Sequence, residues 1–202
     1  MPPRRYAVYV ESRDRFSPGV NPELAKEILC LTRERLRPFL GPLIVARDIT
    51  PFRLPPTDLL DEHAFLPPDD KAILLTTKSP VVPDAPRAVG AHRTYRSTTQ
   101  KQHSYLITQV APSESHKTIG VDNAASVLAH EVCHDYGIGH CAVSSCLMAP
   151  TQQSEADGAA FMKIPNPFCS DHRDELAVIS HLPKVPLTSE LSPSELLASL
   201  RT

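Results

Sequence analysis

Three histidines and one glutamate stand close together in the chain, in the pattern His-Glu-x-x-His-x-x-Gly-x-x-His that starts at His130. His130 and His134 are four residues apart, so on a helix they lie on one face, about one turn apart. Two imidazoles at this spacing can bind one Zn²⁺ at about 2.0–2.1 Å. Glu131, beside the first histidine, is placed to hold a water molecule at the metal and not the metal itself.

The end of the motif supplies a third ligand. Gly137 can adopt a left-handed conformation and end the helix. The chain then turns back, and His140 reaches the metal from outside the helix. Three ligands with an open fourth position are typical of catalytic zinc sites. A bare His-Glu-x-x-His can also be two surface histidines that bind nothing, but the glycine and the third histidine favour the metal site.

The residues before and within the motif predict the helix that positions it. Asp122 can act as the N-cap of a helix over residues 123–136. At about 100° per residue, five mostly apolar residues fall in one sector of this helix: Ala125, Leu128, Ala129, Val132 and Tyr136. His130 and His134 fall on the opposite side, with Glu131 beside them. The pattern predicts a helix with one face in the core and the other toward a cleft.

Cysteines and a methionine follow the third histidine. Cys141 comes directly after His140, Cys146 follows after four residues, and Met148 after one more. This run resembles the archaemetzincin family of metallopeptidases, whose pattern is His-Glu-x-x-His-x-x-Gly-x-x-His-Cys-x4-Cys-x-Met followed by Cys-x-x-Cys. The last pair departs from the family, because Cys169-Ser170-Asp171-His172 stands where Cys-x-x-Cys is expected.

The resemblance implies a second metal site. Cys141, Cys146, Cys169 and His172 form a Cys₃His set of the closed, structural type. Family members carry four cysteines in this role, and a histidine can replace a thiolate while removing one negative charge. A disulfide among the three cysteines, or no metal, is the alternative. We therefore expect two Zn²⁺ per chain, one catalytic and one structural.

Two further sulfur-containing residues need a separate interpretation. Met148 matches the methionine that forms an apolar floor under the metal in metzincins, and its alternative is an ordinary buried methionine. Cys30 lies outside the motif and is predicted to be a small buried residue of a helix.

Strand and helix patterns predict a mixed α/β (α+β) domain. The predicted strands are 6–11, 43–49, 71–77, 88–95 and 104–110, the last two as a hairpin. The predicted helices are 23–37, 123–136 and 171–180. Asn21 and Pro22 predict the start of the first helix and Pro38 its end, and residues 51–70 are predicted as a loop.

The resemblance implies a metzincin-like zincin fold, with a mixed sheet and the active-site helix above a smaller irregular lower part. The expected catalytic domain is 1–182, with an upper part at 1–139 and a lower part at 140–182. Residues 183–202 are expected to be a tail with a short helix. In this fold an edge strand can pair with an extended substrate. Residues 104–110 are a candidate for a place near that edge, which the order of elements alone does not settle.

The composition excludes several partners. The net charge of −2 gives no attraction to nucleic acid or to an anionic membrane. Basic residues and tyrosines of the 88–110 hairpin resemble a nucleic-acid patch, but a hairpin with a solvated face is favoured. No run is long enough to span a membrane and no signal peptide is recognised, so an intracellular, cytoplasmic protein is expected.

The sequence therefore predicts a zinc-dependent metallopeptidase with peptide or protein substrates. A zinc-activated water would attack the peptide bond, with Glu131 as general base. The resemblance includes aminopeptidase-type cleavage among the options. The alternatives are a catalytically silent zinc-binding protein that recognises a peptide or partner, and a structural zinc protein in which only the cysteine cluster matters. The presence of Glu131 argues against a silent site, because binding alone needs no base.

Overall fold

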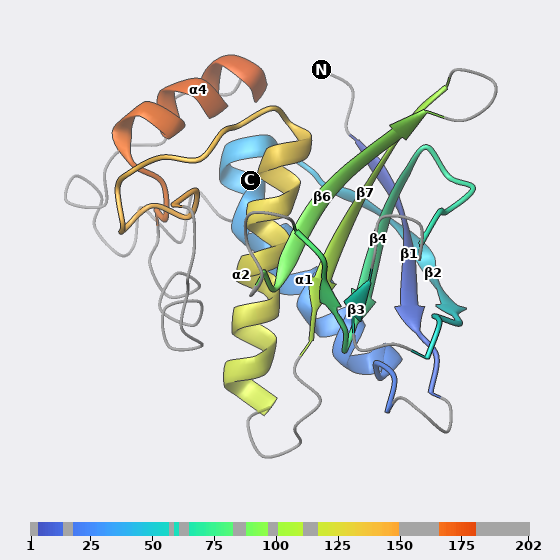
Figure 1. Cartoon of the computed structure of the whole chain (residues 1–202). Coiled ribbons are helices and arrows are strands. Elements are labelled where there is room, and N and C mark those ends of the chain that lie inside the picture. Colours follow the sequence, from blue (N-terminus) through green and yellow to red (C-terminus); the bar gives the residue numbers. More distant parts are fainter. Residues whose placement is uncertain are drawn as a thin grey trace.

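Five strands form a mixed sheet in the computed structural model of this chain (Figure 1). The structure describes residues 4–13, 18–56, 59–60, 65–82, 88–96, 101–110, 117–149 and 166–180. The strands of the sheet are β1 (Arg5–Glu11), β2 (Ile44–Phe52), β4 (Lys71–Thr76), β6 (Gly90–Arg96) and β7 (Gln102–Gln109). Their order across the sheet is β2-β1-β4-β7-β6.

Four neighbouring strands run parallel and the edge strand does not. The pairs β1 with β2, β1 with β4 and β4 with β7 are parallel, whereas β6 is antiparallel to β7. The predicted hairpin is therefore confirmed. The strand at this edge of the sheet is β6. Residues 104–110, considered for the edge from the sequence, belong to the neighbouring strand β7 and lie one strand further in.

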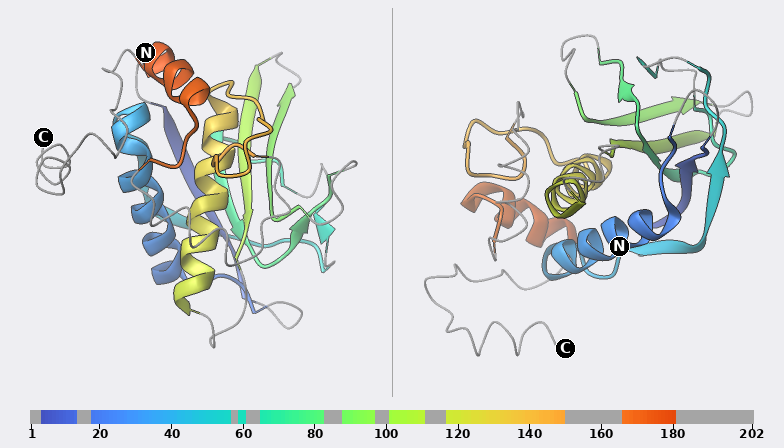
Figure 2. Two further views of the ribbon diagram at one scale, coloured as in Figure 1. Left: turned by 90° about the vertical axis from the view of Figure 1, so that its left-hand side faces the viewer. Right: turned by 90° about the horizontal axis from the view of Figure 1, so that it is seen from below.

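Two long helices cover one face of the sheet. They are α1 (Pro22–Leu40) and α2 (Lys117–Asp135), and they lie side by side (Figure 2). A third helix, α4 (Ser170–Ser180), packs on α1. Val8 of β1, Ile73 of β4 and Leu106 of β7 point to the helices and join them in one hydrophobic core. The mixed α/β fold class predicted from the sequence is confirmed.

The opposite face of the sheet is buried too. Alternate strand residues such as Tyr9, Leu74 and Ile107 form a second apolar cluster there. Phe65 packs edge-on against Tyr9 and covers part of this face. Two short parallel strands, β3 (Leu59–Leu60) and β5 (Ser79–Pro80), form a separate two-stranded sheet. Burial on both faces is typical of parallel strands.

The helix boundaries differ from the predicted ones. Asn21 caps α1 through its side chain, which accepts from the N–H of Glu23, as predicted. The helix continues through Pro38 to Leu40, because Phe39 packs against Phe168 with ring centroids 4.8 Å apart. The helix α2 begins at Lys117, so residue 122 lies within it and is not its N-cap.

Three smaller predictions were wrong. The predicted loop at 51–70 contains the end of β2 and all of β3. Cys30 is exposed, since it lies on the outer side of α1 and donates to Glu34. The helix α2 has no open face at its middle: every residue from 124 to 133 is buried, because α2 packs against α1, β6 and β7.

Within the described ranges, no helix is both long and apolar enough to cross a membrane.

Candidate functional site

Gly137 stands two residues after Asp135, the last residue of α2, and terminates this helix. Gly137 has a φ of 88°, a left-handed value that an L side chain adopts only at a cost. Its N–H donates to the carbonyl of His134 at 2.9 Å, and the N–H of Ile138 donates to that of Cys133 at 3.1 Å. These two bonds form a Schellman motif. The turn predicted at Gly137 is present, and it directs the chain back toward the helix.

The three histidines of the motif meet at one point. The Nε2 atom of His134 lies 2.9 Å from Nε2 of His130 and 3.0 Å from Nε2 of His140. The third side of this triangle, between His130 and His140, is 3.2 Å. A tetrahedral zinc ion with bonds of about 2.0–2.1 Å separates neighbouring nitrogen ligands by about 3.3–3.4 Å. The triangle is therefore close to the size that zinc requires.

Hydrogen bonds at the Nδ1 atoms of His130 and His134 determine that the Nε2 atoms of these rings carry the lone pairs. Nδ1 of His130 bonds to the carbonyl oxygen of Leu147 at 2.7 Å, and Nδ1 of His134 to that of Ile138 at 2.8 Å. A carbonyl oxygen only accepts, so both Nδ1 atoms carry the proton and both Nε2 atoms present lone pairs. Burial lowers the pKa of His130 to about 4, which keeps this ring neutral. Neutral rings with converging lone pairs suit a metal ion.

Glu131 is held beside this triangle against the edge strand β6. Its side chain is buried, and its carboxylate accepts a hydrogen bond from the backbone N–H of His92. A Cβ atom on Gly90 would lie 2.6 Å from Oε1 of Glu131, so this strand leaves room for the carboxylate only because residue 90 is glycine. Burial raises the pKa of Glu131 to about 8, and a cation bound nearby would lower it again.

The second predicted ligand set also comes together. Cys141, Cys146, Cys169 and His172 place one ligand atom each within 4.8 Å of one another. Nδ1 of His172 lies 3.3 Å from Sγ of Cys146 and 3.5 Å from Sγ of Cys169. The departure from the family pattern therefore still leaves four residues at one place that could bind a metal.

The state of the cysteines favours a metal over a disulfide. All five cysteines lie in the described ranges and none of them forms a disulfide. Burial raises the pKa of the Cys146 thiol well above its usual range, and a bound cation would stabilise the thiolate instead. On the far side of the His172 ring, Nε2 lies 4.0 Å from the carboxylate of Glu175. A carboxylate at that nitrogen favours a proton there and leaves Nδ1 free to bind metal.

Met148 lies on the short segment that joins the two clusters. It is fully buried, and its carbonyl oxygen accepts a hydrogen bond from the N–H of Cys141 at 3.0 Å. This burial agrees with both sequence interpretations of Met148, an apolar floor and an ordinary core residue.

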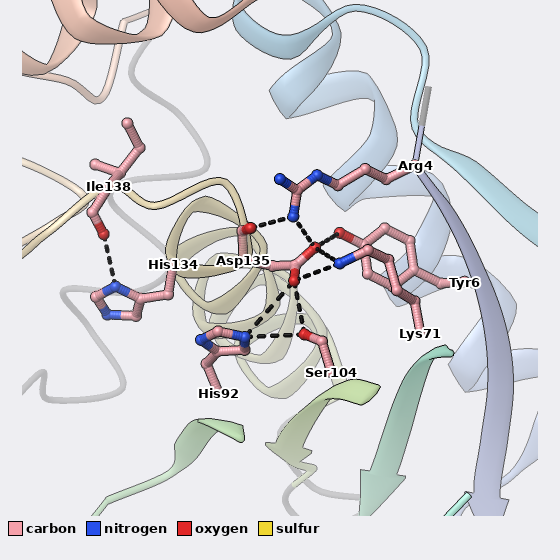
Figure 3. Close-up of polar contacts among 8 residues, drawn as sticks. All are labelled: Arg4, Tyr6, Lys71, His92, Ser104, His134, Asp135 and Ile138. Atoms are coloured by element: carbon pink, nitrogen blue, oxygen red, sulfur yellow. Dashed lines mark hydrogen bonds and ion pairs between the residues drawn. The ribbon is translucent and has the colours of Figure 1, made fainter. Parts of the chain in front are cut away.

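Asp135, the last residue of α2, forms a polar network that the sequence did not predict (Figure 3). Its carboxylate accepts hydrogen bonds from Tyr6 at 2.6 Å, Ser104 at 2.6 Å and Lys71 at 2.7 Å. Arg4 forms an ion pair with it at 2.6 Å and also donates to its backbone carbonyl. These partners come from β1, β4, β7 and the residue before β1. One carboxylate therefore joins the end of α2 to three strands.

His92 of β6 also reaches this network. Its Nε2 lies 2.9 Å from Oγ of Ser104 and 3.6 Å from Oδ1 of Asp135. The sequence had placed it on a solvated hairpin face, but only 22% of its side chain is exposed. Asp135 did give one signal in the sequence: a carboxylate at a helix C-terminus opposes the helix dipole and needs a compensating cation.

Solved structures with this arrangement of helices and strands are known. The archaemetzincin from Methanopyrus kandleri superposes with a TM-score of 0.57 at 18% sequence identity, over 88% of this chain and 95% of that one. The chain has the archaemetzincin fold. A zinc-dependent peptidase from Methanocorpusculum labreanum has a TM-score of 0.49 at 16% identity, over 86% of this chain and 100% of that one. No protein-family model matches the sequence, and no curated protein does so significantly.

The residues singled out from the motif all lie in or beside two clusters of the fold. The predicted ligands fall into two clusters, one of three histidines and one of three cysteines with a histidine. Glu131 and Met148 lie next to them in the chain and are buried. The resemblance seen in the motif is thus matched by a resemblance in fold. Residues 183–202, expected to form a tail with a short helix, lie outside the described residues.

Proposed function

We propose that this chain is a zinc-dependent metallopeptidase. The observation that carries the proposal is the triangle of Nε2 atoms, whose lone pairs are aimed at one point by hydrogen bonds at Nδ1. The fold is similar to that of the Methanopyrus kandleri protein named as an archaemetzincin, and this similarity supports a peptide or protein as substrate. The catalytic domain is proposed to span residues 1–182, as expected from the motif.

His130, His134 and His140 would hold the catalytic zinc. Zinc bound there supplies a Lewis acid that polarises a carbonyl group and makes water more acidic. Cys141, Cys146, Cys169 and His172 would hold a second, structural zinc whose binding energy contributes to folding. Met148 is proposed to form the apolar floor beneath the histidines.

Glu131 is proposed as the general base. Its carboxylate would take a proton from the attacking water and pass it to the amine that leaves when the peptide bond breaks. Its buried position supports this role, because a carboxylate with little water around it is a stronger base than one in solvent. The hydrogen bond from the N–H of His92 holds it in place before the reaction.

Cleavage at the amino terminus of a peptide is one form that this activity can take. An aminopeptidase needs an anionic group for the substrate's α-amine. Asp135 directly follows His134 in the chain, but its charge is already compensated by Lys71 and Arg4. This pairing argues against amine recognition by Asp135.

The test compares wild type with Glu131→Gln. The zinc-loaded proteins are incubated with an unbiased peptide library and the products are identified by mass spectrometry. We expect cleavage by wild type, its loss with a chelator, and a decrease of roughly 10²–10⁴-fold in the variant, which should keep its zinc. Zinc binding without any cleavage by wild type would support the silent peptide-recognition protein instead. Loss of zinc in the variant would identify Glu131 as a ligand or a support of one.

A further inference from the structure

His92 of the edge strand β6 contacts the proposed base and lies near one of the three histidines. Its backbone N–H bonds to the carboxylate of Glu131, and its ring is close enough to His134 to interact with it electrostatically. The strand β6 is at the edge of the sheet, so the N–H groups that point away from β7 are free for such contacts. One residue thus touches the base with its main chain and approaches a ligand with its side chain.

The network behind His92 fixes the proton on its ring. The carboxylate of Asp135 is paired with the cations Lys71 and Arg4, and it also accepts from the hydroxyl of Tyr6. An ionised carboxylate only accepts, so the hydroxyl proton of Ser104 points to Oδ1 of Asp135 at 2.6 Å. Oγ of Ser104 must then accept from Nε2 of His92 at 2.9 Å. In the neutral ring, Nε2 carries the proton and Nδ1 is left as an acceptor.

The free nitrogen points to the side where the metal ligands lie. In Figure 3, Nδ1 of His92 is directed away from Ser104 and toward the side of His134. The side chain of Asp135 is 3% exposed, whereas that of His92 is 22% exposed. The ring of His92 is therefore accessible from outside, whereas the carboxylate behind it is not.

We propose that His92 contacts the substrate, with Nδ1 accepting a hydrogen bond from a main-chain N–H of the peptide held at His130, His134 and His140. Ser104 and Asp135 are positioning residues that set the tautomer and the orientation of the ring. The inference rests on the proposed peptidase function. It gives the buried Asp135 network a role at the site, in addition to joining the helix to the sheet.

Two substitutions of similar size separate this role from a structural one. In His92→Asn the amide takes the place of Nδ1 and the bond to Ser104 is lost. In His92→Gln the amide reaches the place of Nε2, so the bond to Ser104 is kept and the Nδ1 acceptor is lost. Substrate contact predicts that the Gln variant is the weaker enzyme. A purely structural brace predicts the reverse order.

The first measurement is peptide cleavage with the best substrate found in the library. We expect His92→Gln to raise KM and lower kcat/KM by roughly threefold to tenfold, the effect of one lost hydrogen bond. His92→Asn should stay closer to wild type. Zinc content should be the same in all three proteins, and His92→Gln should melt like wild type because its bond to Ser104 is kept. Equal KM values for wild type and His92→Gln, or a weaker Asn variant, would overturn the inference.

The second measurement does not depend on turnover. Calorimetry compares two zinc-binding probes: acetohydroxamate, which has no peptide main chain, and the hydroxamate of the N-terminal product of that substrate. His92→Gln and Ser104→Ala should weaken the peptidyl probe alone, again by roughly threefold to tenfold. Equal weakening of both probes, or of neither, would contradict a peptide contact. Absence of cleavage by wild type would instead remove the proposed function itself.

Discussion

Nδ1 of His130 donates a hydrogen bond to the carbonyl oxygen of Leu147 at 2.7 Å, and Leu147 directly follows Cys146. A histidine of the first cluster is therefore held by the residue next to a cysteine of the second cluster. The opposite end of the segment has a similar link, since His140 and Cys141 are neighbours in the chain. Both clusters thus depend on the conformation of one short segment.

That segment is closed by backbone hydrogen bonds. The N–H of Cys141 donates to the carbonyl of Met148 at 3.0 Å, and the N–H of Leu147 donates to that of Pro167 at 2.6 Å. The second bond joins the segment to the chain that carries Cys169 and His172. A metal bound to these residues would hold the Leu147 carbonyl and His140 in their positions, so the two metal sites should be energetically coupled.

Cys169→Ser tests this coupling, because Cys169 lies outside the joining segment. The substitution weakens the second cluster without changing a residue that touches the three histidines. We expect the zinc affinity of the histidine site to fall by about 10–100-fold, the usual effect of disturbing the groups that hold metal ligands. Competition titration with a chromogenic chelator measures it.

The matched control for this prediction is Cys30→Ser. Cys30 is exposed on α1 and bonds only within that helix, to Glu34. Its replacement should leave both zinc affinities and the melting temperature as in wild type. An unchanged histidine-site affinity in Cys169→Ser would show that the two sites are independent.

Gly90→Ala should disable the proposed base without removing zinc. The new Cβ would lie 2.6 Å from Oε1 of Glu131 and 2.5 Å from Cγ1 of Val127, so both side chains must move. A displacement of about 1 Å at a catalytic group typically costs about 10²-fold in rate. We expect kcat/KM to fall by that order in peptide cleavage assays, with zinc content unchanged.

Gly139→Ala is the control for a glycine near the site. A Cβ there meets no atom within 4 Å, and the glycine is not among those with positive φ. This variant should cleave peptides like wild type. Wild-type activity in Gly90→Ala would mean that Glu131 acts from another position.

The meeting of the three histidines was predictable because they are close in sequence. A spacing of four places two histidines on one helical face, and Gly137 fixes where the chain turns. Strands β1, β4 and β7 were predictable for the same local reason, since each is a short run rich in apolar residues. The end of α1 was not, because Phe39 and Phe168 meet only in the folded chain.

The Asp135 network was beyond sequence reasoning for a physical reason. Its partners Tyr6, Lys71 and Ser104 are 129, 64 and 31 residues away, and they meet only when the parallel strands align. The strand order puts the starts of β1, β4 and β7 side by side under the end of α2. Periodicity gave the strands and their faces, but not this order.

Gly137→Ala should weaken both stability and metal binding. Alanine at a φ of 88° costs about 1–2 kcal/mol. For a chain of this size that lowers the melting temperature by roughly 2–8 °C. The strained turn also shifts the Ile138 carbonyl that holds Nδ1 of His134, so the histidine site should bind zinc less tightly. Calorimetry and chelator titration measure the two effects.

Gly137→Asn separates backbone strain from other effects of the substitution. Asparagine tolerates the left-handed conformation better than alanine does. It should therefore recover part of the stability and of the zinc affinity that alanine loses. If the Asn variant were no better than the Ala variant, strain at this turn would not be the cause.

The two metal sites should release zinc in a fixed order. Freshly purified protein should contain two Zn²⁺ per chain by elemental analysis. The histidine site has three neutral ligands, an exposed His140 and an open position, whereas the other cluster is closed by three cysteines. A mild chelator should therefore remove one zinc first, abolishing peptide cleavage with a small change in melting temperature. Stronger chelation should remove the second and unfold the chain further, because a structural site's binding energy is folding energy. One zinc or less in the purified protein, or loss of the second zinc before activity, would contradict this assignment of the two clusters.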